Sequence, residues 1–451
     1  MAAACGGKLF CESGKENTVI GDVHMDSRKI MPGDVFVAAK GERVDGHDFI
    51  SSVYEKGASC VVCETKPSDE DLVGPDGSRS YIIATSSIQA LKDISAAYRL
   101  TLRLPVIGIT GSVGKTTTKE FIAAVLEQQF DTLKTEGNQN NTLGLPMMVM
   151  KIKEHHQAAV LEMGISDFGE MHELSRDARP DICVITNIGQ CHLEFLHTRD
   201  GILKAKTEIF DYMSENATVI LNGDDDKLST LQEVKGKKPI FYGLDSSFAY
   251  YADEIKDLGL FGSDCILHTP VGMCEAHIPL PGQHMIYNAL AACAVGVTLG
   301  MELGTITEGL AGVRPLGGRC NILRLDKYTV IDDCYNASPA SMRASLDLLN
   351  MADSRKVAVL GDMFELGDNE KKLHEGIGSY AADKADILIS AGGLSECMHE
   401  AAVKAGCKAV HFADTDELMK ELPGLINEGD TILIKASHGM GYAKIVEMLK
   451  K

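Results

Sequence analysis

Short apolar runs separated by amphipathic stretches recur along the whole chain. Runs of four or five residues rich in β-branched side chains are typical of strands buried on both faces of a parallel sheet. Strands that alternate with helical patterns predict an α/β fold. The pattern predicts helices over 50–56 and 87–99, and strands over 34–38, 59–63, 106–110, 158–161, 182–186, 218–221, 239–242, 330–331, 357–360, 387–389, 409–412 and 431–434.

The segment 106–120, VIGITGSVGKTTTKE, has the pattern of a phosphate-binding turn. Backbone N–H groups at a glycine turn, together with the positive end of the helix that follows, attract phosphate. Lys115 adds a charge for the β- and γ-phosphates, and the Thr116 hydroxyl is placed to ligate Mg²⁺. The strand–turn–helix context favours a nucleotide site over an ordinary turn with an exposed lysine. Its predicted residues are Gly111, Ser112, Val113, Gly114, Lys115, Thr116 and Thr117.

Polar residues directly follow several predicted strands in the middle of the chain. Because the carboxyl ends of parallel strands meet at one edge of a sheet, ligands bind there. Glu162 follows the strand 158–161, so we expect it to hold Mg²⁺ beside Lys115; a helix cap is the alternative role. His192 in a loop and Lys206 in a helical stretch are, by themselves, more typical of solvated or structural residues.

Three other polar segments each allow two interpretations. The clusters around Ser27-Arg28 and Asp45-Gly46-His47 have the composition of turns, but the first could hold a phosphate and the second could shape a pocket. The segment 135–146, TEGNQNNTLGLP, is either an irregular loop or a loop that hydrogen-bonds a polar substrate.

Composition excludes several classes of protein. The net charge is −20, with no run of Lys and Arg, so we expect no nucleic-acid partner. No apolar window is long enough for a membrane span or for the core of a signal peptide, which predicts a cytoplasmic protein. The 13 cysteines are scattered and odd in number, as expected of reduced thiols. Cys60 and Cys63 lie within an apolar run, which favours a buried strand over a zinc site.

The order of these elements predicts three domains, which suits a chain of 451 residues. We expect a small α/β N-terminal domain over 1–100, a central P-loop domain with a mostly parallel sheet over 101–312, and a C-terminal Rossmann-like doubly wound domain over 313–451. The third domain lacks G-x-G-x-x-G, so no dinucleotide site is predicted there.

Several segments resemble the ATP-dependent Mur ligases of peptidoglycan synthesis, and they occur in the order that this family has. They include DGHDF, TGSVGKTTTKE, TEGNQNNTLGLP, LEMG, TNIGQCHL, KAKTEIF, PGQHMIYNALAA, DDCYNASPASM and KASHGM, and they span all three predicted domains. TEGNQNN and DDCYNASPASM resemble the branch that joins D-alanyl-D-alanine to UDP-N-acetylmuramoyl-tripeptide. Another Mur-type amide ligase, such as the enzyme adding the third residue or a folylpolyglutamate synthase, is the alternative.

The resemblance implies an ATP-dependent ligase with Mg²⁺ that forms a C–N bond. The γ-phosphoryl group of ATP passes to the terminal carboxylate of the UDP-linked tripeptide, and the amine of the dipeptide attacks the acyl phosphate. A carboxylate is a poor electrophile, so phosphorylation supplies the leaving group, and the protein positions and neutralises charge. We expect a monomer that binds these two substrates.

The resemblance also implies roles for individual residues. Lys115, Glu162, His192, Lys206 and Arg319 are the expected catalytic residues. Thr116 and Glu162 would hold one Mg²⁺ and His192 a second, and Lys206 matches a lysine that family members carbamylate. Carbamylation replaces a cation by an anionic oxygen ligand, so a lysine that would repel Mg²⁺ can then support it.

Other expected site residues come from all three domains. Asn288 is expected near adenine, and Arg319 and Asp333 are expected to reach the phosphates and ribose when the domains close. The uridine diphosphate and muramoyl peptide would contact Ser27, Arg28, Asp45, His47, Asn138 and Asn141. The chain departs from the family pattern at Met285, Ala436 and His438.

Overall fold

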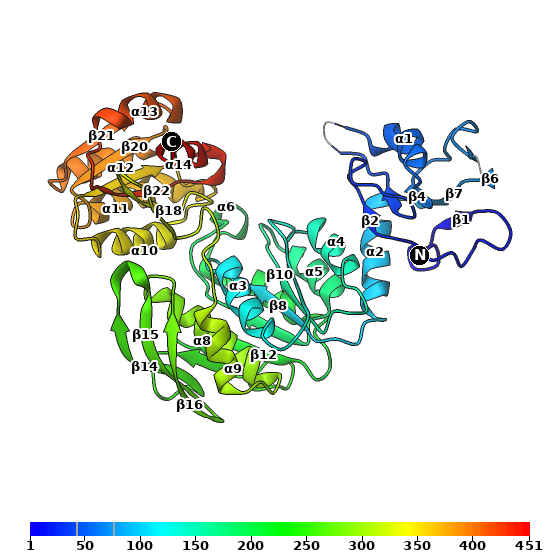
Figure 1. Ribbon diagram of the computed structural model, residues 1–451, viewed down its shortest axis with the longest axis horizontal. Coiled ribbons are helices and arrows are strands. Elements are labelled where there is room, and N and C mark those ends of the chain that lie inside the picture. The colour runs from blue at the N-terminus through cyan, green and yellow to red at the C-terminus, as the bar shows by residue number, and fades with distance from the viewer. Residues whose placement is uncertain (42–43, 75–76) are drawn as a thin grey trace.

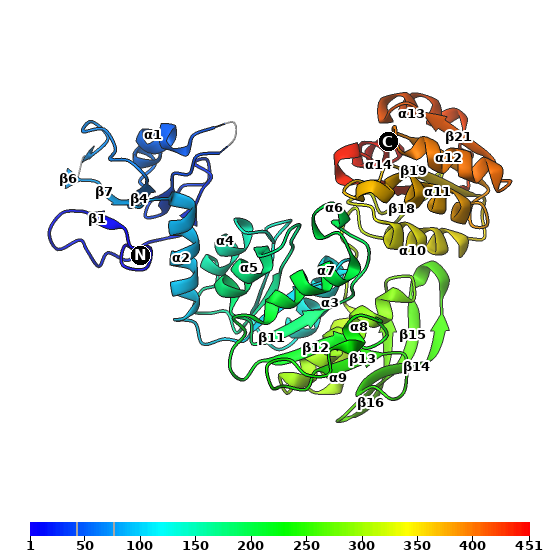
Figure 2. The same ribbon diagram turned by 180° about the vertical axis from the view of Figure 1, so that it is seen from behind.

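The computed structural model describes residues 1–41, 44–74 and 77–451 and has three α/β domains, each built on its own sheet (Figure 1). The N-terminal and C-terminal domains lie at opposite ends of the central domain (Figures 1 and 2). This architecture confirms the fold class that the alternation of apolar runs and helical patterns predicted. The bounds of 1–100, 101–312 and 313–451 stay a prediction. Within the described part of the chain, no helix has the length and apolarity needed to span a bilayer.

The N-terminal domain has a five-stranded sheet in the order β1-β7-β4-β3-β2. Only β1 runs antiparallel to its neighbour β7, and the other pairs are parallel. Cys60 and Cys63 are buried residues of β4, as the apolar run predicted. The elements are β1 (Lys8–Phe10), β2 (Val23–His24), β3 (Val35–Val37), η1 (Gly46–Phe49), α1 (Ile50–Glu55), β4 (Cys60–Cys63), β7 (Ser80–Ile83) and α2 (Ser87–Arg99), with a separate hairpin of β5 (Val73–Gly74) and β6 (Gly77–Ser78).

Helix α2 joins the first domain to the second. It packs against α4 (Gly144–Met150) and α5 (Glu170–Ala178) of the central domain. The buried Arg99 at its end donates from Nε to the Ala178 carbonyl at 2.7 Å and from Nη2 to the Asp181 carboxylate at 2.8 Å. A guanidinium with several partners of fixed geometry holds the two domains together at this helix.

The central domain contains a nine-stranded sheet in the order β16-β15-β14-β13-β12-β11-β8-β10-β9. The neighbouring strands β9, β10, β8, β11, β12, β13 and β14 are parallel, as predicted for this domain. Strands β15 and β16 continue the sheet beyond β14 as an antiparallel extension. The extension was not predicted, because β14 (YYADEIKD) is largely charged and exposed rather than apolar. The strands are β8 (Val106–Thr110), β9 (Thr132–Lys134), β10 (Ala158–Glu162), β11 (Ile182–Ile185), β12 (Thr218–Asn222), β13 (Ile240–Gly243), β14 (Tyr250–Asp257), β15 (Ser263–Thr269) and β16 (Gly272–Ile278).

Helices cover both faces of the central sheet, so the strand β8 is buried on both sides. Ile107 and Ile109 belong to the core formed with α3 and α8, while Val106 belongs to the core formed with α4, α5 and α7. The helices are α3 (Lys115–Leu126), α4, α5, α6 (Leu193–Leu196), α7 (Arg199–Thr207), α8 (His284–Thr298) and α9 (Leu303–Ala311), with the short turns η2 (Glu208–Phe210), η3 (Leu228–Thr230) and η4 (Gly259–Phe261).

The C-terminal domain has a six-stranded sheet in the order β17-β18-β22-β19-β20-β21. Five of these strands are parallel and correspond to the five predicted apolar runs; β17 runs antiparallel at the edge and was not predicted. The elements are β17 (Asn321–Arg324), β18 (Thr329–Asp332), α10 (Pro339–Asn350), β19 (Lys356–Gly361), η5 (Gly367–Asn369), α11 (Glu370–Ala381), β20 (Ile387–Ala391), α12 (Ser395–Lys404), β21 (Ala409–Phe412), α13 (Thr415–Glu421), η6 (Leu422–Gly424), β22 (Thr431–Lys435), η7 (His438–Met440) and α14 (Ala443–Leu449).

Candidate active site at the carboxyl edge of the central sheet

The turn between β8 and α3 has the geometry of a phosphate-binding loop. Gly114 precedes α3 with φ of 86°, a left-handed conformation that suits glycine. A Cβ on Gly111 would lie 1.9 Å from the Thr186 hydroxyl oxygen, so no larger residue fits there. The Lys115 ammonium donates to the Gly111 carbonyl at 2.8 Å, which folds its side chain back over the turn. The N-terminus of α3 and one lysine therefore face the same turn.

Thr186 and Asn187, which follow β11, hold the turn from one side. The carbonyl of Val113 accepts from Thr186 Oγ1 at 2.7 Å and from Asn187 Nδ2 at 2.8 Å. Asn187 Oδ1 accepts from the Val113 N–H at 3.0 Å. Asn187 follows a predicted strand, but its role in shaping the turn was not predicted, because the two segments are far apart along the chain.

Glu162 ends β10, which lies next to β8, so it comes beside the phosphate-binding turn. Its side chain is 2% exposed, and Oε1 accepts from Asn140 Nδ2 at 2.8 Å. In the described residues, Oε2 has no hydrogen-bond partner. A buried carboxylate oxygen without a donor, and the buried hydroxyl-bearing Thr116 at the start of α3, are the kind of hard oxygen ligands that Mg²⁺ requires. Asn140 was missed by sequence reasoning, which selected Asn138 and Asn141 in the same loop.

Lys206 is fully buried in α7, and its ammonium nitrogen has no hydrogen-bond partner among the described residues. Burial lowers the pKa of Lys206 to about 8; Cys191 acts in the opposite direction and the charge of Lys115 adds to the lowering. The side chain is therefore close to Lys115, and its amine is uncharged more often than that of an exposed lysine. An unpaired, buried amine of low pKa is chemically suited to react with CO₂.

His192 precedes α6 with a left-handed backbone and contacts the C-terminal domain. Its Nδ1 lies 2.6 Å from Oε2 of Glu365, although the ring N–H does not point along the line between the two atoms. The short contact to His192 lowers the pKa of Glu365. Glu365 was not among the predicted site residues, because a contact between two domains leaves no local pattern in the sequence.

Asn288 lies next to the phosphate-binding turn on α8. Its Oδ1 accepts from the Thr118 hydroxyl at 2.8 Å, and its Nδ2 donates to the Met285 sulfur at 3.4 Å. A Cβ on Gly114 would lie 3.6 Å from Asn288 Oδ1. The structure therefore brings Asn288 to the turn, and Met285, one of the departures from the family pattern, helps to orient it.

Arg319 and Asp333 engage partners within the C-terminal domain. The Arg319 guanidinium lies over the Tyr335 ring, 3.9 Å from its centroid. Asp333 accepts from the Lys435 ammonium at 2.5 Å and from the Ser345 hydroxyl at 2.6 Å. Burial lowers the pKa of His284 at the start of α8, and the charge of Asp333 acts in the opposite direction, so Asp333 lies close to the central domain.

The predicted nucleotide-sugar residues belong to local networks of the N-terminal domain. Arg28 is exposed and forms a two-point pair with Asp26, holding the pKa of that carboxyl at about 2. The Ser27 carbonyl accepts from the Lys56 ammonium at 2.7 Å. Asp45 Oδ1 lies 2.7 Å from His47 Nδ1 and also accepts from the His47 N–H. Each of these groups still has part of its surface exposed.

Asn138 and Asn141 lie on the surface of the loop that precedes α4. Asn141 Oδ1 accepts from the N–H groups of Leu143 and Gly144 at 3.1 and 2.8 Å, which caps the start of α4. Asn138 is exposed. Of the three asparagines in this loop, Asn140 is the one that contacts Glu162.

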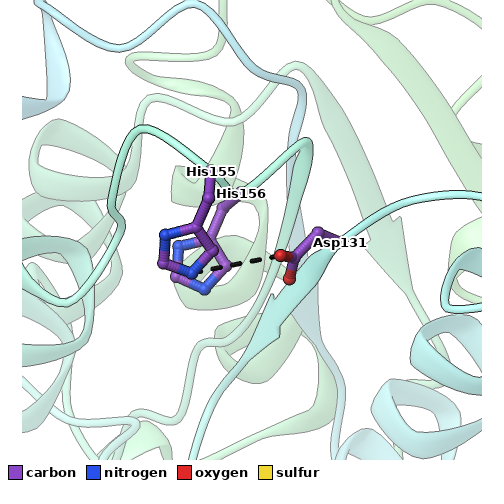
Figure 3. Close-up of side chains that lie close together, drawn as sticks. All are labelled: Asp131, His155 and His156. Carbon is purple, nitrogen blue, oxygen red and sulfur yellow. Dashed lines mark ion pairs between the residues drawn. The ribbon is translucent and has the colours of Figure 1, made fainter.

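Asp131, His155 and His156 gather elsewhere on the central domain (Figure 3). They are the one set of three or more His, Cys, Asp or Glu side chains in the described residues whose ligand atoms all lie within 4.8 Å of one another. His156 Nδ1 accepts from the Lys153 N–H at 2.8 Å, so a neutral ring has its proton on Nε2 and offers no free lone pair. Asp131 precedes β9, at the amino edge of the sheet and away from the phosphate-binding turn. The cluster is therefore not part of this site.

Comparison with known proteins assigns all three domains. The model described as "Mur ligase family, catalytic domain" matches residues 19–109, "Mur ligase middle domain" matches 109–296, and "Mur ligase, glutamate ligase domain" matches 318–438. The chain belongs to the Mur ligase family. This membership confirms the resemblance, and with it an ATP-dependent ligase that forms an amide bond in peptidoglycan synthesis.

Individual Mur ligases align with this chain along nearly its full length. UDP-N-acetylmuramoyl-tripeptide–D-alanyl-D-alanine ligase of Bacillus subtilis is 37% identical over 442 residues, covering 96% of this chain and 94% of that protein. The crystal structure of MurF from Acinetobacter baumannii has a TM-score of 0.89 at 32% identity and covers 100% of this chain and 97% of the other. MurF of Thermotoga maritima, solved with ADP, has a TM-score of 0.82 at 29% identity and covers 95% and 97%.

Proposed function

We propose that this Mur ligase joins D-alanyl-D-alanine to the tripeptide of UDP-N-acetylmuramoyl-tripeptide, using ATP. The observation that carries the proposal is the buried set of Glu162, Lys206 and Thr116 around the turn that ends in Lys115. A second line of support comes from sequence. Proteins named for this activity are 32–37% identical to this chain over nearly its full length. The branch-specific segments TEGNQNN and DDCYNASPASM support this activity over that of another Mur-type ligase.

In this proposal, the turn and Lys115 bind the β- and γ-phosphates of ATP and neutralise their charge. The terminal carboxylate of the tripeptide attacks the γ-phosphorus, ADP leaves, and a mixed acyl phosphate forms. The neutral amine of D-alanyl-D-alanine then attacks the acyl carbon, phosphate leaves, and the amine gives up its proton. Positioning and charge neutralisation supply the rate enhancement, without a covalent enzyme intermediate.

The oxygen and nitrogen ligand atoms near the phosphate-binding turn suit two Mg²⁺ ions. Thr116 and Glu162 would hold the first, and His192 with carbamylated Lys206 would hold the second. Bound Mg²⁺ would supply Lewis-acid neutralisation of the phosphoryl oxygens. The unpaired Oε2 of Glu162 and the unpaired Nζ of Lys206, both identified among the described residues, are the features that support this assignment. A carbamate forms when the uncharged Lys206 amine attacks CO₂ and loses one proton, which adds an anionic oxygen ligand.

The remaining predicted residues are assigned to substrates. Asn288 is proposed to contact adenine, and Arg319 and Asp333 to reach the nucleotide when the C-terminal domain moves toward the central domain. Ser27, Arg28, Asp45 and His47 would contact the uridine diphosphate, and Asn138 and Asn141 the muramoyl peptide. Small-angle scattering should show compaction with an ATP analogue and the UDP-linked tripeptide; an unchanged radius of gyration would contradict the closure.

We also infer that the enzyme is a monomer and acts in the cytoplasm.

An ADP-release assay with exchanged acceptors tests the proposal. Continuous ADP release over many turnovers should require ATP, the UDP-linked tripeptide and D-alanyl-D-alanine together. Replacing the dipeptide by a single amino acid, and the tripeptide by a UDP-linked dipeptide, separates this activity from that of another Mur-type ligase. Lys115→Ala should abolish turnover while the fold persists. Turnover with the exchanged pair and none with the proposed pair would contradict the assignment.

A further inference from the structure

A cavity of about 350 Å³ lies where the central domain meets the C-terminal domain. Gln190 and Leu193 of the central domain form one wall, and residues of α10, η5 and α11 form the other. The short helix α6 lies against the C-terminal domain (Figures 1 and 2), and a Cβ on Gly367 would lie 3.6 Å from the Glu194 backbone. The volume is within the range of about 300–1,000 Å³ that is usual for small-ligand sites, which often lie at domain boundaries.

The cavity is positively charged, although the chain as a whole has a net charge of −20. Arg343 of α10 and Lys372 of α11 line it, together with the amide side chains of Gln190 and Asn369. None of the described residues that line it is acidic. Both cations are exposed, so a ligand reaches them from solvent. Two cations and two amides in one small cavity offer the hydrogen-bond donors that an oxyanion requires.

Arg343 has no carboxylate partner in the described part of the chain, and neither has Lys372. Asp347 lies four residues further along α10, a spacing at which an arginine and an aspartate can pair. Its carboxylate instead accepts from the Tyr380 hydroxyl at 2.6 Å and lies 3.3 Å from the Lys384 ammonium. The Arg343 guanidinium lies over the Tyr380 ring, 4.4 Å from its centroid, which orients the plane of the group beside the cavity.

Gly376 keeps space open beside Arg343. It lies inside α11, where glycine is less favourable than alanine. Outside its own helix, the only atom of the described residues within 4 Å of a Cβ built there would be Nη2 of Arg343, at 3.7 Å. Close packing therefore does not require glycine at this position. A larger side chain would instead occupy the cavity, which Gly376 lines next to the guanidinium.

We propose that this cavity binds a small oxyanion, a carboxylate or a phosphate, through Arg343 and Lys372. The bound anion would contact Gln190 of the central domain as well as the two cations of the C-terminal domain, so it would link the domains. Two sources of the anion suit the cavity. One is the terminal carboxylate of the acceptor dipeptide, an option that rests on the proposed function, and the other is free inorganic phosphate.

The position of the cavity makes the acceptor a candidate. Gln190 and Leu193 lie on either side of His192 in the chain, and His192 belongs to the proposed reaction site. An extended dipeptide spans about 7 Å, so one end can lie in the cavity while its amine lies outside it. Leu193, Leu373 and Ile377 line the cavity and suit the methyl side chains of such a peptide.

The first test measures the binding of inorganic phosphate to the full-length protein by ³¹P NMR titration. Lys115→Ala serves as the background, because the phosphate-binding turn is the other expected phosphate site. Arg343→Gln and Gly376→Leu should each weaken the remaining phosphate binding at least about 10-fold, since a charge-assisted hydrogen bond or the space for the ligand is lost. Lys371→Gln is the matched control, because Lys371 is an exposed lysine next to Lys372 that does not line the cavity.

The second test compares kcat/KM for D-alanyl-D-alanine with kcat/KM for its C-terminal amide, which lacks the carboxylate charge. If the acceptor is the ligand, the wild type should prefer the free acid at least about 10-fold. Arg343→Gln should then lose most of this preference, while its KM for ATP stays unchanged. If free phosphate is the ligand, the preference should be equal in the wild type and in Arg343→Gln, and the phosphate affinity alone should change.

A phosphate affinity and an acceptor preference that are both unchanged in Arg343→Gln and in Gly376→Leu would overturn the proposal. The proposed function can fail separately. A protein that releases no ADP with the full set of reactants, yet binds phosphate through Arg343, has the oxyanion site without the proposed reaction. A protein that turns over as proposed but ignores both substitutions has the reaction without this site.

Discussion

The ammonium of Lys435 lies 2.5 Å from the carboxylate of Asp333, and both side chains are buried. Lys435 ends β22 and Asp333 follows β18, so the pair joins two neighbouring strands at the carboxyl edge of the C-terminal sheet. Asp333 also accepts from the Cys320 N–H at 3.0 Å, in the segment that enters the domain from the central one. The pair thus fixes the place where the two domains connect.

Removing one member of this pair should destabilise the C-terminal domain. In Lys435→Met, Asp333 loses its charged partner while it stays buried, which costs about 3–5 kcal/mol in comparable cases. The urea transition assigned to this domain should therefore shift to lower denaturant concentration. The double variant Lys435→Met with Asp333→Asn should recover part of the loss. Equal destabilisation in the single and double variants would contradict this role for the pair.

Gly111→Ala should impair nucleotide binding more than it impairs folding. The added methyl group would lie 1.9 Å from Thr186 Oγ1 and would push the turn away from Thr186. We expect the affinity for ATP to fall by at least about 10-fold, measured by calorimetry, because each 1.4 kcal/mol of lost interaction is tenfold. Gly304→Ala is the control, since a Cβ there meets no atom of the described residues within 4 Å. Wild-type affinity in Gly111→Ala would argue against the turn as the phosphate site.

Lys206 should take up CO₂ in a pH-dependent manner. Burial holds its pKa at about 8, below the ordinary value of 10.5, so its uncharged amine is abundant at pH 8 and becomes scarce below that pH. With ¹³C-labelled bicarbonate, NMR should show a carbamate carbon that gains intensity from pH 7 to 9 and is absent in Lys206→Met. No such signal at any pH in the wild-type protein would exclude the carbamate.

Asp177 at the end of α5 should make the central domain less stable as pH rises. Burial raises the pKa of Asp177 to about 6, compared with 3.8 in its ordinary state. Below about pH 4 the carboxyl is protonated in the folded and unfolded chains, and its contribution to stability is greatest. Between about pH 4 and 6 the unfolded chain loses the proton first, so the free energy of unfolding falls by about 3 kcal/mol at most.

Asp177→Asn tests this directly. The variant should unfold at a higher temperature than the wild type at pH 7.5, because the amide carries no charge into the buried site. The difference should shrink toward pH 4.5, where the wild-type carboxyl is protonated in the folded chain. Calorimetry at the two pH values measures it, and an equal difference at both would contradict burial of the Asp177 charge as the cause.

The parts of this molecule that the sequence predicted are those with local signals. Gly111 to Lys115 combine a strand, a turn and a helix start within a few residues, and Glu162 directly follows an apolar run. Because neighbouring parallel strands end at the same edge of a sheet, the turn and Glu162 come close together. The resemblance supplied roles for His192 and Lys206, which their local sequence alone would not single out.

The features that were missed depend on contacts between distant segments. Asn187 acts on the turn through Val113, Asn140 acts through Glu162, and Glu365 meets His192 across a domain boundary. The members of each pair are far apart along the chain, and no characteristic spacing or periodicity in the sequence connects them. The antiparallel extension β14–β16 was missed for a different reason, because buried and exposed positions alternate along these strands and charged residues interrupt them, so they contain no long apolar run.

The central claim is that a phosphoryl group passes from ATP to the carboxylate of the tripeptide before the amide forms. The most direct measurement uses a UDP-linked tripeptide with ¹⁸O in its terminal carboxylate, together with ATP and D-alanyl-D-alanine, followed by mass analysis of the released phosphate. The account predicts one ¹⁸O atom in each phosphate, because the bridging oxygen of the acyl phosphate leaves with phosphorus. Phosphate without ¹⁸O, released along with the amide product, would contradict it.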